Sequence, residues 1–215
     1  MDDILVLGAT GKTGRRLVRL LRERDLPVRP ASRSSAVRFD WSGPQTWEPA
    51  TKGARAVYLV APDDPAPIAG FVDQARRNGP VERFVVLSGR GIEHVEGDFG
   101  AGMATAERAV AASGAEWTVL RPNEFAQNFD AVEIMGRAAG RTIEYVELTP
   151  AAYRAELIAE GCPEAVADAL GEMFALHRAG HTVEPTGDVR RVLGREPIAF
   201  ADYAARAATA GAWSV

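Results

Sequence analysis

The first half of the chain alternates short apolar runs with segments of helical periodicity. Four continuous apolar runs, and a fifth strand expected after the first helix, give the predicted strands 4–7, 28–31, 56–60, 84–87 and 117–120. Continuous runs of this length are typical of strands buried on both faces of a parallel sheet. The predicted helices between them are 14–23, 67–77 and 103–113. This alternation predicts an α/β, Rossmann-like fold with a doubly wound parallel sheet.

The pattern changes in the second half of the chain. It predicts helices at 131–139 and 200–208, two helices within 150–179 that are interrupted near 161–163, and an extended segment at 142–148. The sequence therefore predicts a Rossmann domain over residues 1–129 and a small, mostly helical lobe over residues 130–215.

Composition narrows the function. The chain has 215 residues and a formal net charge of -4, which argues against a nucleic-acid partner bound through phosphate contacts. Its single cysteine, Cys162, excludes an intramolecular disulfide. The first residues lack the basic start of a secretory signal, and no apolar run approaches the roughly 18 residues of a membrane span. We expect a cytoplasmic protein with neither a membrane nor a nucleic-acid partner.

A glycine-rich motif carries the main functional signal. Residues 8–14 read Gly-Ala-Thr-Gly-Lys-Thr-Gly, between a predicted buried strand and an amphipathic helix. Glycines there allow a tight turn and close approach to a pyrophosphate, which the helix N-terminus attracts. The alternative is a glycine-rich turn without a ligand. The expected cofactor contacts are Gly8, Thr10, Gly11, Lys12, Thr13 and Gly14, with Ala61 and Pro62 at another strand end.

Two neighbouring features refine the choice of ligand. Val6 stands where a P-loop requires its first glycine, so the NTPase interpretation fails. The region after the second strand has no acid before Asp40, whereas an NAD enzyme usually places one there for the ribose hydroxyl. Arg33 and the serines around it suit a 2′-phosphate, which favours NADP(H). The alternative for Arg33 is a surface arginine without a ligand. Asp40 is either a neighbour of the adenine or an ordinary loop aspartate.

Taken together, these residues resemble the NmrA-like branch of the atypical short-chain dehydrogenase/reductases. The matching segments are 8–14, 58–62 (Tyr-Leu-Val-Ala-Pro), 86–89 (Val-Leu-Ser-Gly) and 117–122 (Trp-Thr-Val-Leu-Arg-Pro), followed by Phe125 and Asn128. The resemblance covers residues 1–129, and more loosely 131–200. It implies NAD(P)H binding, with reduction of quinones or other carbonyl compounds in some members. Other members sense the redox state of the dinucleotide and regulate a protein partner.

The chain departs from that family in two respects. Ordinary members use a Tyr-x-x-x-Lys pair, but neither Lys12 nor Lys52 follows a tyrosine by four positions. Hydride transfer to a carbonyl needs a proton donor, whereas quinone reduction depends on it less. Relatives also usually carry a further block, on the order of 60 residues, before the helix expected at 131–139. Its absence leaves three alternatives: an open site, a site that a second subunit completes, or no small substrate.

Polar residues at the other strand ends are the candidates for chemistry. Ser88 and Asn123 are suited to bind a substrate oxygen, and Glu124 is suited to act as an acid or base if burial raises its pKa. The alternative is that they, like Arg121, only close loops. His94 lies in a glycine-rich loop suited to close over a substrate, although most loop histidines are simply exposed.

The sequence thus predicts an NADP(H)-binding oxidoreductase that transfers hydride to a quinone or similar aromatic carbonyl compound. The alternatives are a non-catalytic NADP(H) sensor that binds a protein partner, and a non-redox enzyme acting on an aromatic metabolite. A homodimer stays open. No metal site is expected, because no cysteine or carboxylate completes a set with His177 and His181.

Overall fold

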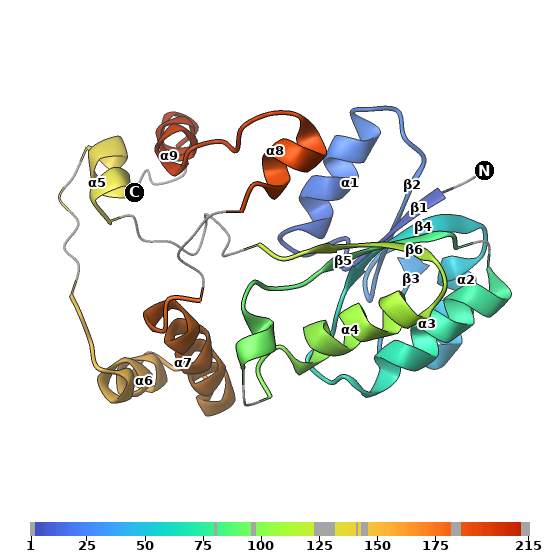
Figure 1. The fold of residues 1–215 in the computed structure, drawn as a ribbon, viewed down its shortest axis with the longest axis horizontal. Coiled ribbons are helices and arrows are strands. Elements are labelled where there is room, and N and C mark those ends of the chain that lie inside the picture. Colours follow the sequence, from blue (N-terminus) through green and yellow to red (C-terminus); the bar gives the residue numbers. More distant parts are fainter. Residues whose placement is uncertain are drawn as a thin grey trace. The chain divides into compact units, whose positions relative to one another are not determined.

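The chain divides into two compact units, Met1–Pro122 and Asn123–Val215. The computed structural model describes residues 3–79, 81–95, 98–122, 132–140, 142, 146–181 and 186–211 (Figure 1). The predicted boundary between residues 129 and 130 lies outside the described residues.

A six-stranded parallel sheet forms the first unit. Its strands are β1 (Asp3–Leu7), β2 (Val28–Ser32), β3 (Val37–Arg38), β4 (Ala54–Val60), β5 (Arg83–Leu87) and β6 (Glu116–Leu120), arranged in the order β3-β2-β1-β4-β5-β6. This order reverses direction between β1 and β4, and doubly wound sheets bind ligands beyond the carboxyl ends of the strands at that point. The Rossmann-like fold class is confirmed.

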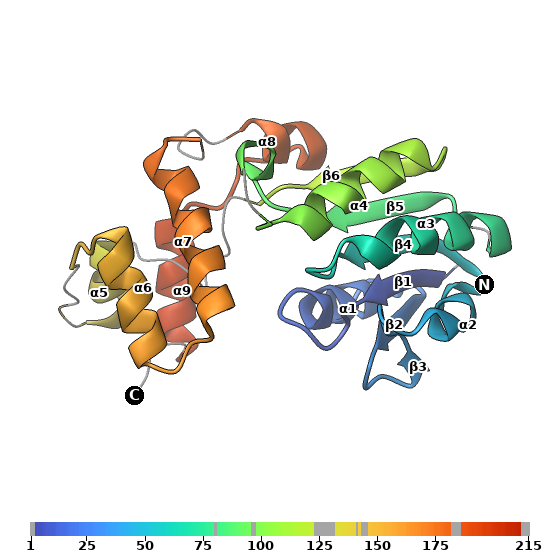
Figure 2. The same cartoon turned by 90° about the horizontal axis from the view of Figure 1, so that it is seen from below.

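Helices cover both faces of this sheet (Figures 1 and 2). They are α1 (Gly14–Arg22), α2 (Trp47–Thr51), α3 (Ala66–Asn78) and α4 (Ala101–Ala112), with 3-10 turns η1 (Pro44–Thr46) and η2 (Ile92–His94). Helix α1 packs on one face against β1 and β2, while α2, α3 and α4 lie on the other. The five predicted strands and three predicted helices of this unit are present; β3, α2 and the 3-10 turns are additional.

Strands β1, β2, β4 and β5 send alternate residues into two cores, whereas β6, predicted as a strand buried on both faces, leaves Trp117 and Leu120 exposed. On the face of α2, α3 and α4, Phe71 is fully buried and lies edge-to-face against the rings of Phe39, Trp41 and Trp47, with centroids 5.1–5.8 Å apart. Such aromatic pairs contribute about 0.5–1.5 kcal/mol each beyond the area that they bury. The smaller core beneath α1 contains the buried residues Val6, Ala9, Val18 and Tyr58.

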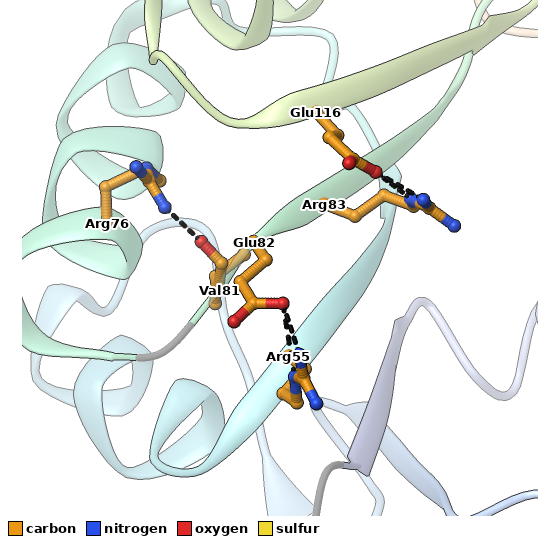
Figure 3. A network of polar contacts seen from close by, with 6 residues as sticks. All are labelled: Arg55, Arg76, Val81, Glu82, Arg83 and Glu116. Atoms are coloured by element: carbon orange, nitrogen blue, oxygen red, sulfur yellow. Dashed lines mark hydrogen bonds and ion pairs between the residues drawn. The ribbon is translucent and has the colours of Figure 1, made fainter.

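Ion pairs join the strands at the amino edge of the sheet (Figure 3). Arg55 of β4 binds the carboxylate of Glu82, which precedes β5, with the closest atoms 2.5 Å apart. Arg83 of β5 binds Glu116 of β6 in the same way, and Arg76 of α3 donates to a backbone carbonyl beside them. These arginines are therefore engaged in holding neighbouring strands, although exposed pairs of this kind contribute at most about 1 kcal/mol each.

The described part of the second unit is helical. Its helices are α5 (Val132–Ala139), α6 (Pro150–Ala159), α7 (Glu164–Arg178), α8 (Asp188–Leu193) and α9 (Phe200–Thr209). Helix α6 packs beside α7 through the rings of Tyr153 and Phe174 and through an Arg154–Asp168 ion pair of 2.6 Å, and α5 packs against α9 (Figure 2). Residues 142 and 146–148 of the predicted extended segment have no regular secondary structure.

Candidate functional site

The glycine-rich loop lies at the carboxyl edge of the sheet, between β1 and α1. Gly8 has a φ of +64°, a conformation that side chains disfavour, and it turns the chain out of β1. The Gly11 N–H donates to the Gly8 carbonyl at 2.9 Å, and the Ala9 N–H donates to the Ala31 carbonyl of β2 at 3.1 Å. These bonds close the loop and fasten it to the neighbouring strand.

Gly14 sets the distance between this loop and α1. A Cβ atom at Gly14 would lie 2.2 Å from the carbonyl oxygen of Gly8 and 2.8 Å from the Cα of Ala9. Only glycine permits this approach, which brings the first turn of α1 against the end of β1. The residues Gly8, Thr10, Gly11 and Lys12 are exposed. An exposed loop leading into a helix N-terminus fits the pyrophosphate of a dinucleotide.

Tyr58 of β4 contacts the end of the same loop at Thr13. Its side chain is 7% exposed and forms a hydrogen bond with the side chain of Thr13. Burial raises the pKa of Tyr58, and the bond with Thr13 offsets part of that effect. The phenol is therefore neutral at physiological pH, and it fixes the last turn of the loop before α1. The sequence analysis predicted that Thr13 contacts the cofactor but did not identify Tyr58 as its partner.

The loop after β2 presents hydroxyl groups and an arginine. Ser32 is buried, with its Oγ 2.7 Å from the Oγ of Ser35, and it accepts the N–H of Ser34 at 3.2 Å. Arg33 between them is exposed. Asp40 accepts the hydroxyl of Ser42 at 2.8 Å, so one carboxylate oxygen closes its own turn.

The end of β4 is fixed by α4. A Cβ atom at Gly102 would lie 1.8 Å from the carbonyl oxygen of Pro62, because the first turn of α4 rests directly on this backbone. Ala61 and Pro62, which the sequence predicts to contact the cofactor, are half-buried at this edge. Gly102 thus holds the segment after β4 at a defined position, a role that the sequence did not indicate.

A partly buried polar network joins the ends of β5 and β6. Ser88 follows β5, is 4% exposed, and donates its hydroxyl to Oε1 of Glu107 at 2.6 Å. Arg121 follows β6 and binds the same carboxylate with two donors, Nε at 2.9 Å to Oε1 and Nη2 to Oε2. The Ser88 N–H also donates to the Leu120 carbonyl at 2.8 Å. Helix α4 thereby fastens two strand ends with one side chain.

This geometry keeps Glu107 ionised. Burial acts to raise the pKa of Glu107, but the hydrogen bonds from Arg121 and Ser88 and the charge of Arg121 together hold that pKa below its ordinary value. The bond with Glu107 in turn raises the pKa of Arg121. Glu107 is therefore no proton donor at neutral pH, and the Ser88 hydroxyl proton is directed toward it. The network is suited to holding the edge of the sheet in shape.

The other residues predicted to act on a substrate are Asn123, Glu124 and His94. Asn123 and Glu124 lie outside the described residues. His94 is exposed in η2. The sequence identified Ser88 and Arg121 but not Glu107; the available signal was one acidic residue in the helix between two strands that each end in a polar residue. Their roles toward a substrate stay predictions.

Two other features, a metal site and a membrane span, are absent from the described residues. They contain no group of three histidine, cysteine or acidic side chains arranged to hold a metal ion. None of their helices combines the length and the apolar character needed to cross a membrane.

Comparison with known proteins agrees with this geometry. Residues 8–145 match the model of a family described as NAD(P)H-binding. The chain is 28% identical to the uncharacterized oxidoreductase YesF of Bacillus subtilis, over 95% of this chain and 94% of YesF. It is 26% identical to an NAD(P)H azoreductase of Xenophilus azovorans, over 97% and 99%. The YesF alignment spans 278 positions, so YesF has residues without a counterpart in these 215.

Solved structures share the fold at low sequence identity. The NADPH-dependent quinone oxidoreductase QOR2 of Escherichia coli, crystallised with NADPH, has a TM-score of 0.80 and 14% identity, covering 94% of this chain and 99% of that one. The triphenylmethane reductase of Citrobacter, crystallised with NADP(H), has a TM-score of 0.72 and 13% identity, covering 95% and 99%. The fold, the glycine-rich edge and the family match together show that this chain belongs to the NAD(P)H-binding family of Rossmann-fold oxidoreductases.

Proposed function

We propose that this protein is an NADPH-dependent reductase of quinones or similar flat, electron-poor aromatic compounds. The observation that carries the proposal is the character of the sheet edge: it holds a dinucleotide loop but lacks the usual proton donor. The sequence between Ser88 and Arg121 contains neither tyrosine nor lysine, and Glu107 within it is held ionised. An acceptor whose reduced form tolerates negative charge suits such an edge best.

The chain's own residues would bind and orient the cofactor. Apart from those of Ala9 and Gly11, which bind backbone carbonyls, the N–H groups of the loop up to Gly14 would bind the pyrophosphate. Arg33 and its neighbouring serines would bind the 2′-phosphate. When bound, NADPH supplies a hydride at its nicotinamide ring. Quinone reduction yields a phenolate-like anion, which is far less basic than an alkoxide and takes its proton from water. The network of Ser88, Glu107 and Arg121 keeps the adjoining strand ends fixed.

The relatives support this class of chemistry. The names of two of them specify quinone and azo reduction with a nicotinamide cofactor. Quinones and azo compounds both accept hydride at a conjugated, electron-poor centre. For this chain, the quinone itself is inferred from the sheet edge, and the choice of NADPH over NADH is inferred from Arg33.

The test is NADPH oxidation followed by absorbance with a panel of quinones, and in parallel with simple ketones and aldehydes. We expect quinone-dependent oxidation and no turnover of the ketones. The Gly14→Ala variant, in which the loop is displaced, is the control for cofactor dependence. Turnover of ketones at comparable rates would contradict the argument from the missing proton donor. Tight NADPH binding without turnover of any compound would overturn the reductase proposal.

A second candidate function is an NADP(H) sensor that regulates a protein partner. The observation that favours it is the engagement of Ser88, whose hydroxyl is buried and donates to Glu107. A site without a free catalytic side chain still binds the cofactor. A sensor would bind NADPH and NADP⁺ with different affinities and show no turnover, which separates it from the reductase in the same set of measurements.

A further inference from the structure

The short strand β3 brings a second arginine to the carboxyl edge. In the register of β2 and β3, Ser32 pairs with Arg38 and Ala31 pairs with Val37. Ala31 and Val37 belong to the core on the face of α2, α3 and α4. Because successive strand residues point to opposite faces, Ser32 and Arg38 both point to the face on which α1 lies. Arg38 therefore stands beside the buried serine that organises the loop around Arg33.

Arg33 and Arg38 differ from the arginines at the opposite edge of the sheet. Arg55 and Arg83 are each bound to a carboxylate there (Figure 3), and so is Arg29, which binds Asp3. In contrast, Arg33 and Arg38 are exposed, and within the described part of the chain neither of their side chains forms a hydrogen bond or an ion pair. The arginines at the amino edge thus form ion pairs that join neighbouring segments of the sheet. The two at the ligand edge keep their guanidinium donors available.

Asp40 shows that these two charges act on the same region. Hydrogen bonds from the hydroxyl and N–H of Ser42 are the largest influences that hold the pKa of Asp40 below its ordinary value. The charges of Arg33 and Arg38 lower this pKa further. Both guanidinium groups are therefore close enough to influence the same anionic group. Because the Asp40 carboxylate is already hydrogen-bonded to Ser42, it leaves the guanidinium donors open to a second anion.

We propose that Arg38 acts with Arg33 as a two-arginine clamp for a ribose 2′-phosphate, with the hydroxyls of Ser34 and Ser35 as further donors. A phosphate monoester carries nearly two negative charges at neutral pH and accepts several charge-assisted hydrogen bonds, so two guanidinium groups match it better than one. The 2′-hydroxyl of NADH offers no charge to either arginine. The inference rests on the proposed preference for NADPH and adds a specificity-determining residue to it.

The test measures binding of two cofactors and two fragments by calorimetry. Wild type, Arg33→Ala, Arg38→Ala and Arg38→Lys are titrated with NADPH, NADH, adenosine 2′,5′-bisphosphate and adenosine 5′-diphosphate. We expect Arg38→Ala to weaken both 2′-phosphate ligands about tenfold or more, because it loses a charge-assisted contact, and to leave the other two nearly unchanged. Arg38→Lys should recover part of the loss. Arg77→Ala, an exposed arginine of α3, is the matched control and should change no affinity.

Each outcome decides the inference separately from turnover. Selective loss for the 2′-phosphate ligands supports the clamp even if no quinone is reduced. Unchanged affinity of Arg38→Ala for adenosine 2′,5′-bisphosphate, with loss in Arg33→Ala, would overturn it and leave a single-arginine site. Equal weakening of all four ligands would also overturn it, because Arg38 would then act through the fold. Thermal unfolding of each variant identifies any that is destabilised.

Discussion

Gly14→Ala is the perturbation whose consequences the structure defines most closely. The new Cβ would lie 2.2 Å from the Gly8 oxygen, whereas real Cβ atoms stay at least 3.0 Å from such neighbours. Helix α1 or the loop must therefore move by about 0.8 Å or more, and both groups in contact are backbone with no flexible end. Overpacking of this kind typically costs about 1–3 kcal/mol of folding stability.

The same displacement acts on cofactor affinity. Moving the loop by this distance would weaken or break the hydrogen bonds from one or two N–H groups to the pyrophosphate. Hydrogen bonds to charged groups contribute about 1.5–3 kcal/mol each, so NADPH affinity should fall by roughly tenfold to a hundredfold or more. Tryptophan fluorescence with NADPH measures the affinity, and urea unfolding measures the stability.

A matched substitution isolates the effect of the contact. Gly70→Ala lies in α3 of the same unit, where the added Cβ meets only a tryptophan ring carbon at 3.8 Å. Because glycine in a helix interior costs about 0.5–1 kcal/mol relative to alanine, Gly70→Ala should be neutral or stabilising and should bind NADPH normally. Unchanged NADPH affinity in Gly14→Ala, together with a stability loss below about 1 kcal/mol, would refute the reasoning.

Three further substitutions test other parts of the structure. Glu107→Gln should lower the free energy of unfolding by about 1 kcal/mol at neutral pH, since half-exposed Arg121 loses its charged partner. The folded-state pKa of Glu107 lies below its unfolded value, so this stabilisation is present above the ordinary carboxyl pKa and is lost as pH falls through the folded pKa. The free energies of unfolding of wild type and Glu107→Gln, measured by urea titration, should therefore converge in acid. A difference that stays constant with pH would contradict the assignment. Tyr58→Phe should cost about 0.5–1.5 kcal/mol and weaken NADPH binding, because Thr13 loses its partner; unchanged values in urea and fluorescence titrations would count against this support. Gly171→Ala in α7, where nothing lies within 4 Å of the added Cβ, should stabilise the second unit by about 0.5–1 kcal/mol on thermal unfolding, and a loss would contradict the open position.

Local pattern was sufficient for most of the fold. Runs such as 84–87 are continuous and apolar because their strand is covered on both faces, so the residue types alone indicate the burial. The glycine motif is equally local, since Gly8 and Gly14 serve a turn and a contact only six residues apart. The alternation of strands and helices predicted the doubly wound parallel class, whereas the strand order itself comes from the structure.

Features that join distant segments were not predictable in this way. Strand β3 has two residues and exists only through its pairing with β2, so its composition carries no signal of its own. Glu107 resembles any acidic residue on a helix until the sheet brings Ser88 and Arg121 to it from strands on either side. The sequence determined the fold class and the dinucleotide loop because burial and turns act over short stretches. Only the tertiary structure decided which charges are paired and which stay available to a ligand, because pairing depends on the register between strands.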